Sequence, residues 1–204
     1  MEPDSEPILE SNLILASTSP YRRRLLERLG LPFRIEDPAV QEIARAKEPA
    51  ETMAARLARA KAFAVSKEHP SAWVIGSDQT ATCADRVLRK PGSEAAARAQ
   101  LTACRGKTAV FFTSVALFRN SELVSEEAVE TAVTFRELSE LEVERYVERD
   151  KPLDCAGGFR WEGIGICLFS SLRSGDPTAL EGLPLIAVSK MLRDQGLNPL
   201  LSPI

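Results

Sequence analysis

Residues 13–26 read Leu-Ile-Leu-Ala-Ser-Thr-Ser-Pro-Tyr-Arg-Arg-Arg-Leu-Leu. The apolar run at 13–16 predicts a buried strand, and Ser19 followed by Pro20 predicts the N-cap and first position of a helix. A helix start offers free backbone N–H groups and a positive dipole end, and the adjacent arginines add charge that suits an anion such as phosphate. An ordinary strand, turn and helix with a solvated basic face accounts for this segment equally well.

The position of Arg22 within the expected helix favours the anion site. At helical spacing, Arg22 lies on the same stripe as Leu25 and Leu29, which are expected to pack on the core. An arginine at the edge of a core requires a buried anion as its partner. Arg22 is therefore a candidate phosphate ligand.

Length and composition are those of an ordinary globular protein. The 204 residues, 44% hydrophobic and 27% charged, suffice for one substantial core. A net charge of −3 argues against a general nucleic-acid binder, which usually carries a basic excess. The four cysteines form no C-x-x-C pair and His69 is the one histidine, which argues against structural zinc and favours reduced thiols in the cytoplasm.

The chain is expected to form a disordered acidic extension over residues 1–11 and a single domain over residues 12–204. Residues 1–10 are acidic and contain two prolines, unlike a secretory signal or a membrane anchor. No apolar run approaches the roughly 18 residues that span a bilayer. We expect a cytoplasmic protein with no membrane partner.

Strands and helices alternate along the chain, which predicts an α/β protein with a central mixed, twisted sheet flanked by helices and a cleft at the strand ends. Residues 154–184 are glycine-rich and aperiodic, as in loops that approach a ligand closely. The expected strands are 13–16, 32–36, 73–77, a hairpin within 80–88, 108–118 and 123–135, and the main expected helices are 20–29, 51–67, 93–104, 139–148 and 185–194.

Several charged residues are candidates for a polyphosphate site. Asp78 directly follows the apolar strand expected at 73–77, which suits a metal ligand or a general base, although a turn or capping aspartate is the commoner outcome. Lys90 lies at a chain reversal and is equally explained as a surface lysine. Cations neutralise phosphate charge while a carboxylate holds Mg²⁺ or orients water. The candidate set is Ser17, Arg22, Lys61, Asp78 and Lys90.

Together these motifs resemble the Maf family of nucleoside triphosphate pyrophosphatases, which is related in fold to the inosine triphosphatases. The resemblance extends over about residues 13–199, and the combination of Ser-x-Ser-Pro-x-Arg-Arg with Gly-Ser-Asp-Gln is highly specific. The matching segments are Leu-Ala-Ser-Thr-Ser-Pro-x-Arg-Arg at 15–23, Glu42, Ala-Lys-Ala at 60–62, Ile-Gly-Ser-Asp-Gln at 75–79, Lys-Pro at 90–91, Cys-Ala-Gly-Gly-Phe at 155–159, Glu-Gly-Ile-Gly at 162–165 and Gly-Leu-Pro at 182–184.

Three positions look like the 7-methyl-GTP pyrophosphatases of that family, namely Tyr21, Gln79 and Glu162. The dTTP/UTP branch typically has arginine, threonine and glutamine there. A 7-methylguanine base is cationic and favours an aromatic face and a carboxylate. Tyr21 is expected to stack on the base, with Trp161 stacking instead or beside it, and Glu162 to accept hydrogen bonds from guanine N1–H and the exocyclic amine.

The resemblance implies cleavage between the α and β phosphates, giving 7-methyl-GMP and pyrophosphate. It implies Asp78 as the base that activates water, and a divalent cation (Mg²⁺, Mn²⁺ or Co²⁺) held by Glu42 and Asp78. It also implies a homodimer and a small-molecule nucleotide as substrate. The implied triphosphate ligands are Ser17, Ser19, Arg22, Lys61 and Lys90.

Two alternatives remain open at the sequence level. One is the same chemistry on dTTP and UTP, and the other is a nucleotide-binding regulator of cell division with little catalysis. The chain departs from the family pattern at Gln41, where an aspartate is usual, and at Arg89 and Ser114, where glycines are usual. The missing carboxylate at position 41 is expected to weaken or alter metal binding.

Overall fold

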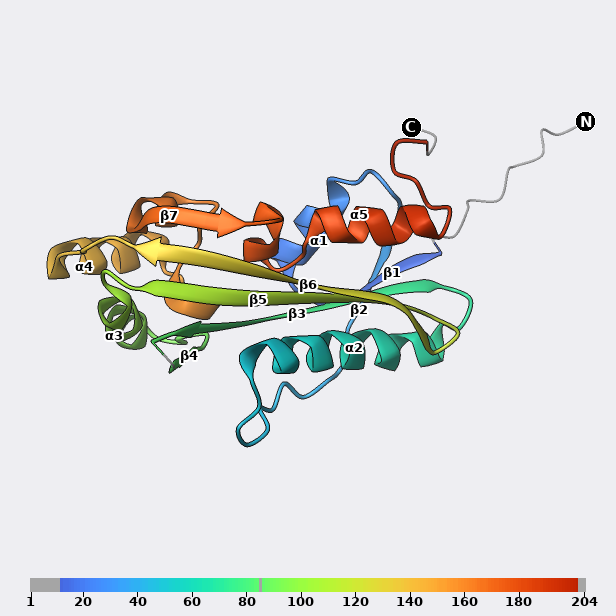
Figure 1. Cartoon of the computed structure of the whole chain (residues 1–204), viewed down its shortest axis with the longest axis horizontal. Helices are drawn as coiled ribbons and strands as arrows, with labels where there is room; N and C mark the ends of the chain where they lie inside the picture. The colour runs from blue at the N-terminus through green and yellow to red at the C-terminus, as the bar shows by residue number, and fades with distance from the viewer. Residues whose placement is uncertain (1–11, 85, 202–204) are drawn as a thin grey trace, which may run out of the picture.

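A mixed seven-stranded sheet forms the centre of the molecule (Figure 1). The computed structural model describes residues 12–84 and 86–201, so the extension expected at 1–11 lies outside the described residues. The strand order is β2-β1-β3-β5-β6-β7, with β4 also paired to β3. The strands are β1 (Leu13–Ala16), β2 (Arg34–Glu36), β3 (Trp73–Cys83), β4 (Arg86–Leu88), β5 (Thr108–Arg119), β6 (Glu122–Phe135) and β7 (Phe169–Ser174).

Helices cover both faces of this sheet (Figure 1). Helix α2 lies on one face, α1 and α5 lie on the opposite face, and α3 and α4 pack together at the far end. No helix in the described part of the chain is both long and apolar enough to cross a membrane. The helices are α1 (Pro20–Glu27), α2 (Ala50–Glu68), α3 (Glu94–Cys104), α4 (Glu140–Asp150) and α5 (Leu185–Asp194), with short 3-10 segments η1 (Ala156–Gly158), η2 (Ile164–Leu168) and η3 (Pro177–Glu181).

Strand β3 changes its neighbour along one edge. Residues 73–75 pair with β1 in parallel, and residues 81–83 pair with β4 in antiparallel. The other edge pairs with β5 over residues 74–83. Among the described residues, the stretch 76–80 therefore has a strand neighbour on one side only, and the opposite edge is open to a ligand.

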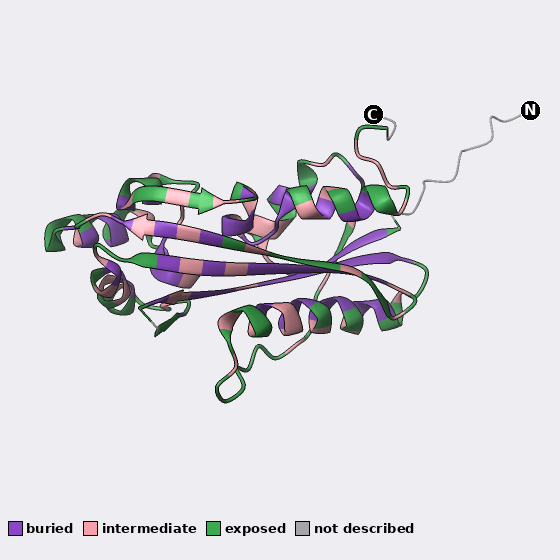
Figure 2. Cartoon of the chain, viewed as in Figure 1, coloured by how far each residue is buried: buried purple, intermediate pink, exposed green. Residues whose placement is uncertain are grey.

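The alternation of side chains along β1 explains how the two layers of core form. Leu13 and Leu15 pack in the cluster beneath α1 and α5, whereas Ile14 and Ala16 pack in the cluster beneath α2. Both sets are buried because helices cover both faces of a partly parallel sheet. Figure 2 shows this burial continuing along β3 and the middle of β5.

Helix α2 packs unusually close to β3 at Gly76. A Cβ atom at Gly76 would lie 2.3 Å from the backbone oxygen of Ala58 and 2.8 Å from Cβ of Ala62. Small residues on both elements therefore allow the close approach. The same approach brings Lys61 of α2 beside Asp78, two residues further along β3.

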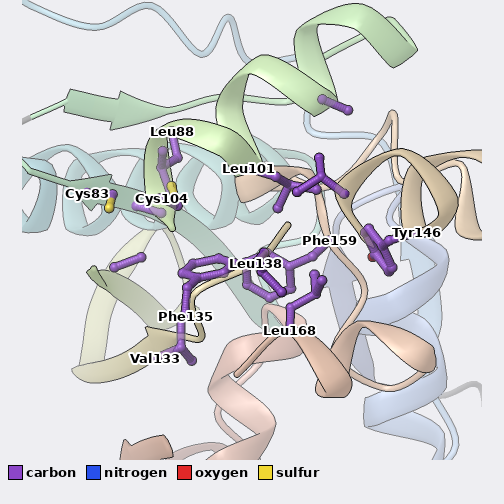
Figure 3. Packing of buried hydrophobic residues seen from close by; sticks show 14 of the residues in the cluster. Cys83, Leu88, Leu101, Cys104, Val133, Phe135, Leu138, Tyr146, Phe159 and Leu168 are labelled. Carbon is purple, nitrogen blue, oxygen red and sulfur yellow. The ribbon is translucent and has the colours of Figure 1, made fainter. Parts of the chain in front are cut away.

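A third cluster of apolar side chains fixes the glycine-rich segment around η1 (Figure 3). The ring of Phe159 makes edge-to-face contacts with Phe111, Phe135 and Phe169, with centroid separations of 5.5, 5.7 and 4.8 Å. Such pairs stabilise beyond their area burial, by about 0.5–1.5 kcal/mol each. Phe159 therefore anchors the residues that precede it, including Cys155, against the sheet.

Most expected elements are confirmed with differences at their ends, but strand β7 was not expected, because it lies in the segment 154–184 that was interpreted as aperiodic loop. Ser19 accepts a hydrogen bond from the Arg22 N–H at 3.4 Å and caps α1, and Ser139 with Glu142 forms the expected capping box. The strand expected over 32–36 begins at Arg34. The expectation that a strand ends at Ser77 is wrong, because β3 continues to Cys83 through its pairing with β5.

Candidate active site

Arg22 is held at the start of α1 by backbone and hydroxyl groups. Its Nε donates to the carbonyl of Gly182 at 2.8 Å, and its Nη1 donates to Oγ of Ser17 at 3.4 Å. The same Ser17 oxygen accepts from the Ser19 N–H at 3.2 Å. Burial lowers the pKa of Arg22, and the nearby carboxylates of Asp78 and Glu42 oppose that shift. The guanidinium is thus oriented and partly desolvated, as expected for Arg22.

One ammonium group joins two carboxylates on the α2 side of β3. Lys61 Nζ lies 2.6 Å from Oδ1 of Asp78 and also pairs with Glu42. Both Lys61 and Asp78 are only 4% exposed. Burial raises the pKa of Asp78 above its usual range, and the charges of Lys61 and Arg22 offset this only in part. Burial also acts to raise the pKa of Glu42, but the hydrogen bond and charge of Lys61 outweigh it and the pKa is lowered.

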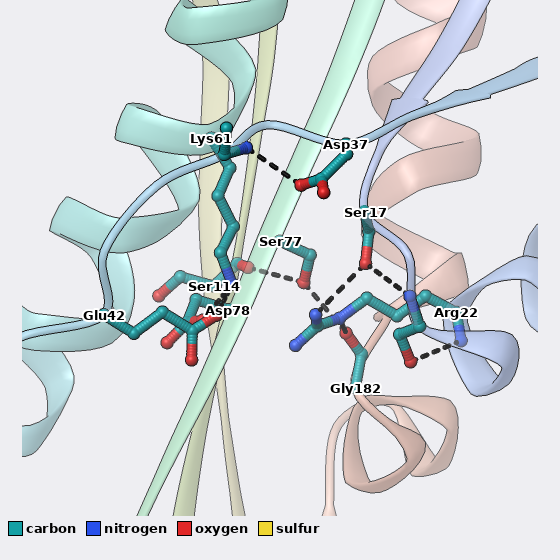
Figure 4. A network of polar contacts seen from close by, with 11 residues as sticks. Ser17, Arg22, Asp37, Glu42, Lys61, Ser77, Asp78, Ser114 and Gly182 are labelled. Carbon is teal, nitrogen blue, oxygen red and sulfur yellow. Dashed lines mark hydrogen bonds and ion pairs between the residues drawn. The ribbon is translucent and has the colours of Figure 1, made fainter.

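Asp78 lies within a strand rather than after one, which corrects the sequence-based interpretation. Alternation along β3 turns Asp78 toward α2, while Ser77 and Gln79 face the other side. Figure 4 shows the resulting two groups flanking β3, with Lys61 and Glu42 on one side and Arg22 and Gly182 on the other. Asp78 is reachable because β1 has already ended beside it.

Ser77 and Gln79 attach the η3 segment to the sheet. Ser77 Oγ lies 2.9 Å from the Gly182 carbonyl oxygen and 2.8 Å from that of Ser114, both acceptors for its one proton. The Gln79 amide nitrogen lies 2.9 Å from both Thr113 Oγ1 and the Ala179 carbonyl oxygen. The donors of Gln79 are therefore committed to protein partners, and any effect of Gln79 on a ligand acts through its carbonyl or through the position of η3.

A pocket of about 300 Å³ opens along the unpaired edge of β3. Lys61 and Ser17 are buried behind its wall, where they contact Asp78 and Arg22 respectively. The structure therefore brings all the expected site residues to one place. Those that line the pocket are Ser19, Tyr21, Arg22, Glu42, Asp78, Gln79, Lys90 and Glu162.

Two groups of side chains line the pocket. Arg22, Glu42, Asp78 and Lys90 lie close enough for their charges to interact, and so do Glu162 and Glu181, with Trp161 beside Glu181. Arg24 lies 5.1 Å from the centroid of the Tyr21 ring, so one face of that ring already has a cationic neighbour.

Tyr21 is also fixed at its hydroxyl, which donates to Asp154 at 3.4 Å. Burial raises the pKa of Tyr21, so its ring stays neutral. Tyr21 is thereby oriented as a flat neutral surface at the wall of the pocket.

Four residues at the site were not found from the sequence. Ser77 and Thr113 hold the η3 segment, Gly182 supplies the carbonyl that orients Arg22, and Glu181 adds a carboxylate to the pocket wall. Gly182 adopts φ +103°, a conformation that favours glycine, and a Cβ there would approach Arg22 Nε to 3.3 Å. The available signals were the motifs Ile-Gly-Ser-Asp-Gln at 75–79, which contains Ser77, and Gly-Leu-Pro at 182–184, which contains Gly182.

The donor set of the site fits a divalent cation that is shared with phosphate. Within residues 12–84 and 86–201 no group of three or more His, Cys, Asp and Glu side chains is arranged to hold a metal. Glu42 and Asp78 nevertheless offer hard carboxylate oxygens at one point. Mg²⁺ is usually held by one or two carboxylates, with water and substrate phosphate completing its octahedron. Two carboxylates meet that requirement.

The fold and the site define an α/β protein with a pocket lined by both cationic and acidic side chains at an open strand edge. The family model described as Maf-like protein matches residues 12–195. The chain belongs to the Maf-like protein family.

Two curated relatives of similar length carry the same name. A protein from Aromatoleum aromaticum named 7-methyl-GTP pyrophosphatase is 52% identical over 188 residues, covering 92% of this chain and 97% of its own. One of the same name from Albidiferax ferrireducens is 46% identical over 197 residues, covering 96% and 98%. A solved structure titled nucleoside-triphosphatase / dITP/XTP pyrophosphatase, from Mycobacterium abscessus, has a TM-score of 0.44 at 18% identity, covering 90% of this chain and 97% of its own.

Proposed function

We propose that this chain is a nucleoside triphosphate pyrophosphatase that hydrolyses 7-methyl-GTP to 7-methyl-GMP and pyrophosphate. One observation carries the proposal: a single pocket is lined both by Arg22, Lys90, Glu42 and Asp78 and by the aromatic and acidic side chains of Tyr21, Trp161, Glu162 and Glu181. The first group suits a triphosphate with a cation, and the second suits a cationic purine. The names of the relatives from Aromatoleum and Albidiferax support the same substrate.

Asp78 acts as the general base in this proposal. Its raised pKa makes the carboxylate a better proton acceptor than an ordinary aspartate. Lys61 holds Oδ1 at 2.6 Å and fixes the plane of the carboxylate, so the other oxygen receives the proton of the attacking water. The water oxygen bonds to the α phosphorus, the bond to the bridging α–β oxygen breaks, and pyrophosphate departs with the electron pair.

The triphosphate is bound by the start of α1 and by lysine. Arg22 and Lys90 neutralise phosphate charge, while the Ser19 hydroxyl and the Tyr21 N–H donate hydrogen bonds. The other N–H groups at the start of α1 do not contribute, because Pro20 has none and those of Arg22 and Arg23 donate to Ser19. Ser17 acts behind them by orienting Arg22. Lys61 contributes positive charge from behind Asp78.

Glu42 and Asp78 would hold a divalent cation, Mg²⁺, Mn²⁺ or Co²⁺, which supplies charge neutralisation at the phosphates when bound. The Lys61 ammonium group pairs with both carboxylates and neutralises part of their negative charge, so the protein alone attracts the metal cation less strongly. Gln41 is exposed and offers a neutral amide where the family usually has an aspartate. We therefore expect metal to bind weakly without nucleotide and more tightly with it.

The base is recognised by Tyr21, Trp161 and Glu162 in this proposal. The base stacks on the Tyr21 face that Arg24 does not occupy, or on Trp161, and Glu162 accepts from the guanine edge. Gln79 contributes by holding η3 in place.

A cytoplasmic location and a homodimer complete the proposal. All four cysteines are free, which agrees with a reducing compartment. Light scattering on purified protein measures the oligomeric state, and a mass of one chain at assay concentration contradicts the homodimer.

A substrate panel tests the proposed activity. Pyrophosphate release is measured for 7-methyl-GTP, GTP, dTTP, UTP and the other canonical triphosphates, each with Mg²⁺, Mn²⁺ and Co²⁺. We expect the highest kcat/KM with 7-methyl-GTP and no release after chelation of the metal. Preference for dTTP or UTP overturns the substrate, and nucleotide binding without release under every metal favours a regulatory protein.

A further inference from the structure

Tyr21, Trp161 and Glu162, which the proposed function assigns to the nucleobase, line what is here called the base end of the pocket. A second acidic side chain, Glu181, lies there, and the sequence motifs assign it no role. It is the last residue of η3 and lines the same pocket as Glu162, Tyr21 and Trp161. Its place is fixed, because the Gln79 amide nitrogen lies 3.2 Å from the carbonyl oxygen of Leu180, the residue before it. Gly182, the residue after it, accepts the Arg22 hydrogen bond. Glu181 is therefore joined through its neighbours to both β3 and α1.

Glu181 and Glu162 line the same pocket and lie close enough for their negative charges to repel. Burial raises the pKa of the half-buried Glu181, and the negative charge of Glu162 raises it further. The Trp161 N–H lies beside the Glu181 carboxylate without a well-formed hydrogen bond, and together with the more distant Arg28 and Arg24 it offsets the shift only in part. A cation placed between the two carboxylates would relieve their repulsion.

Hydrogen bonding to the guanine edge by itself does not select the methylated base. Guanine and 7-methylguanine both present N1–H and the exocyclic amine, so a carboxylate at Glu162 accepts from either one. The two bases differ in charge, because methylation at N7 makes the ring cationic. A second negative charge at the base end strengthens the binding of 7-methylguanine but not that of guanine, because it attracts only the charged ring.

We infer that Glu181 forms, with Glu162, an acidic pair that selects a positively charged purine over its neutral counterpart. The inference rests on the proposed function for its substrate and adds a specificity-determining residue to that site. In this assignment Glu162 accepts hydrogen bonds from the guanine edge, and the negative charge of Glu181 attracts the positively charged ring. Trp161, packed against the neighbouring apolar cluster, holds the Glu181 side of the pocket in shape.

Binding of nucleosides without phosphates tests this assignment separately from catalysis. Titration calorimetry compares the affinities of 7-methylguanosine and guanosine for wild type, Glu181→Gln and Glu162→Gln. Glu130→Gln is the matched control, because Glu130 is an exposed glutamate on β6 outside the pocket lining and its loss changes the net charge equally. Thermal unfolding verifies that each variant is folded.

We expect Glu181→Gln to lower the ratio of affinities for 7-methylguanosine and guanosine about tenfold, with guanosine binding little changed. Glu130→Gln is expected to keep the wild-type ratio. An unchanged ratio in Glu181→Gln, or an equal loss for both nucleosides, overturns the role of Glu181. Wild-type hydrolysis of 7-methyl-GTP is measured in parallel: its absence contradicts the proposed function, whereas its presence with an unchanged ratio contradicts the acidic pair alone.

Discussion

Lys61 Nζ lies 2.6 Å from Oδ1 of Asp78, in a pair whose members are both 4% exposed. The same ammonium group also pairs with Glu42, whose side chain is half exposed. One ammonium group therefore pairs with two carboxylates, of which only Asp78 is buried. Loss of the ammonium group leaves the buried Asp78 with only the charge of Arg22 to offset it, whereas loss of Asp78 leaves Lys61 paired with Glu42.

This asymmetry predicts unequal effects on stability. Lys61→Met is expected to lower the free energy of unfolding by about 3–5 kcal/mol at neutral pH, because Asp78 must then be buried unpaired or take up a proton. Asp78→Asn is expected to lower the free energy of unfolding clearly less, because it removes a carboxylate whose charged form is disfavoured by burial. Urea unfolding followed by circular dichroism measures both values. Equal losses would show that Glu42 does not compensate Lys61.

Asp78 is also expected to control turnover and its pH dependence. Asp78→Asn and Asp78→Ala remove the proton acceptor, so kcat is expected to fall about 10²–10⁴-fold while nucleotide binding remains measurable. In wild type, the raised pKa of Asp78 means that activity is lost on acidification at a higher pH than the ordinary 3.8 of aspartate allows. Normal hydrolysis of 7-methyl-GTP by Asp78→Ala would remove Asp78 from the role of base.

The sequence predicts which candidate residues come together better than it predicts how they are held in place. Arg22 was correctly placed at the edge of the core, because its spacing from the leucines of α1 is a local property. Asp78 was selected because it follows an apolar run and was therefore assigned to a strand end. The strand in fact continues, and the place where β1 stops pairing with β3 depends on tertiary structure.

The structure of residues 154–184 could not be predicted from the sequence, for a different physical reason. Residues 154–184 form three short 3-10 segments and the edge strand β7 without a clear apolar periodicity, and their positions depend on side chains far away in the chain. Gln79 holds the carbonyl of Ala179 and Phe159 packs on Phe111, contacts that no local pattern encodes. Glu181 was missed for that reason.

The segment that carries Glu42 is attached to α2 by a strong ion pair, which gives an acid-sensitive prediction. Arg56 donates to both carboxylate oxygens of Glu48 at 2.6 and 2.7 Å, and mainly this contact lowers the pKa of Glu48 from 4.5 to about 2. Because the pKa is lower in the folded state, the stabilisation is present above pH 4.5 and is lost as the pH falls toward 2. Glu48→Gln should therefore be less stable than wild type at neutral pH and converge with it near pH 2.

Glu48→Gln is also expected to lower the affinity for the activating metal. Arg56 contacts both Glu48 and the carbonyl of Ile43, so the ion pair restrains the segment that carries Glu42. The metal concentration for half-maximal activity is expected to rise in Glu48→Gln with little change in kcat at saturation. Glu130→Gln serves again as the control for a lost surface carboxylate. A Glu48→Gln variant with wild-type stability at every pH and wild-type metal dependence would contradict the role of the ion pair.

The last prediction concerns the choice between purine and pyrimidine nucleotides. Glu162 is exposed at the base end of the pocket, where a carboxylate accepts hydrogen bonds from the guanine edge that uracil and thymine cannot donate in the same pattern. Glu162→Gln keeps the shape but replaces one acceptor with a donor. We expect the ratio of kcat/KM for 7-methyl-GTP and UTP to fall about tenfold, through KM more than kcat, because the phosphate end is unchanged. Steady-state assays on both nucleotides measure the ratio, and a value equal to that of wild type would exclude Glu162 from base recognition.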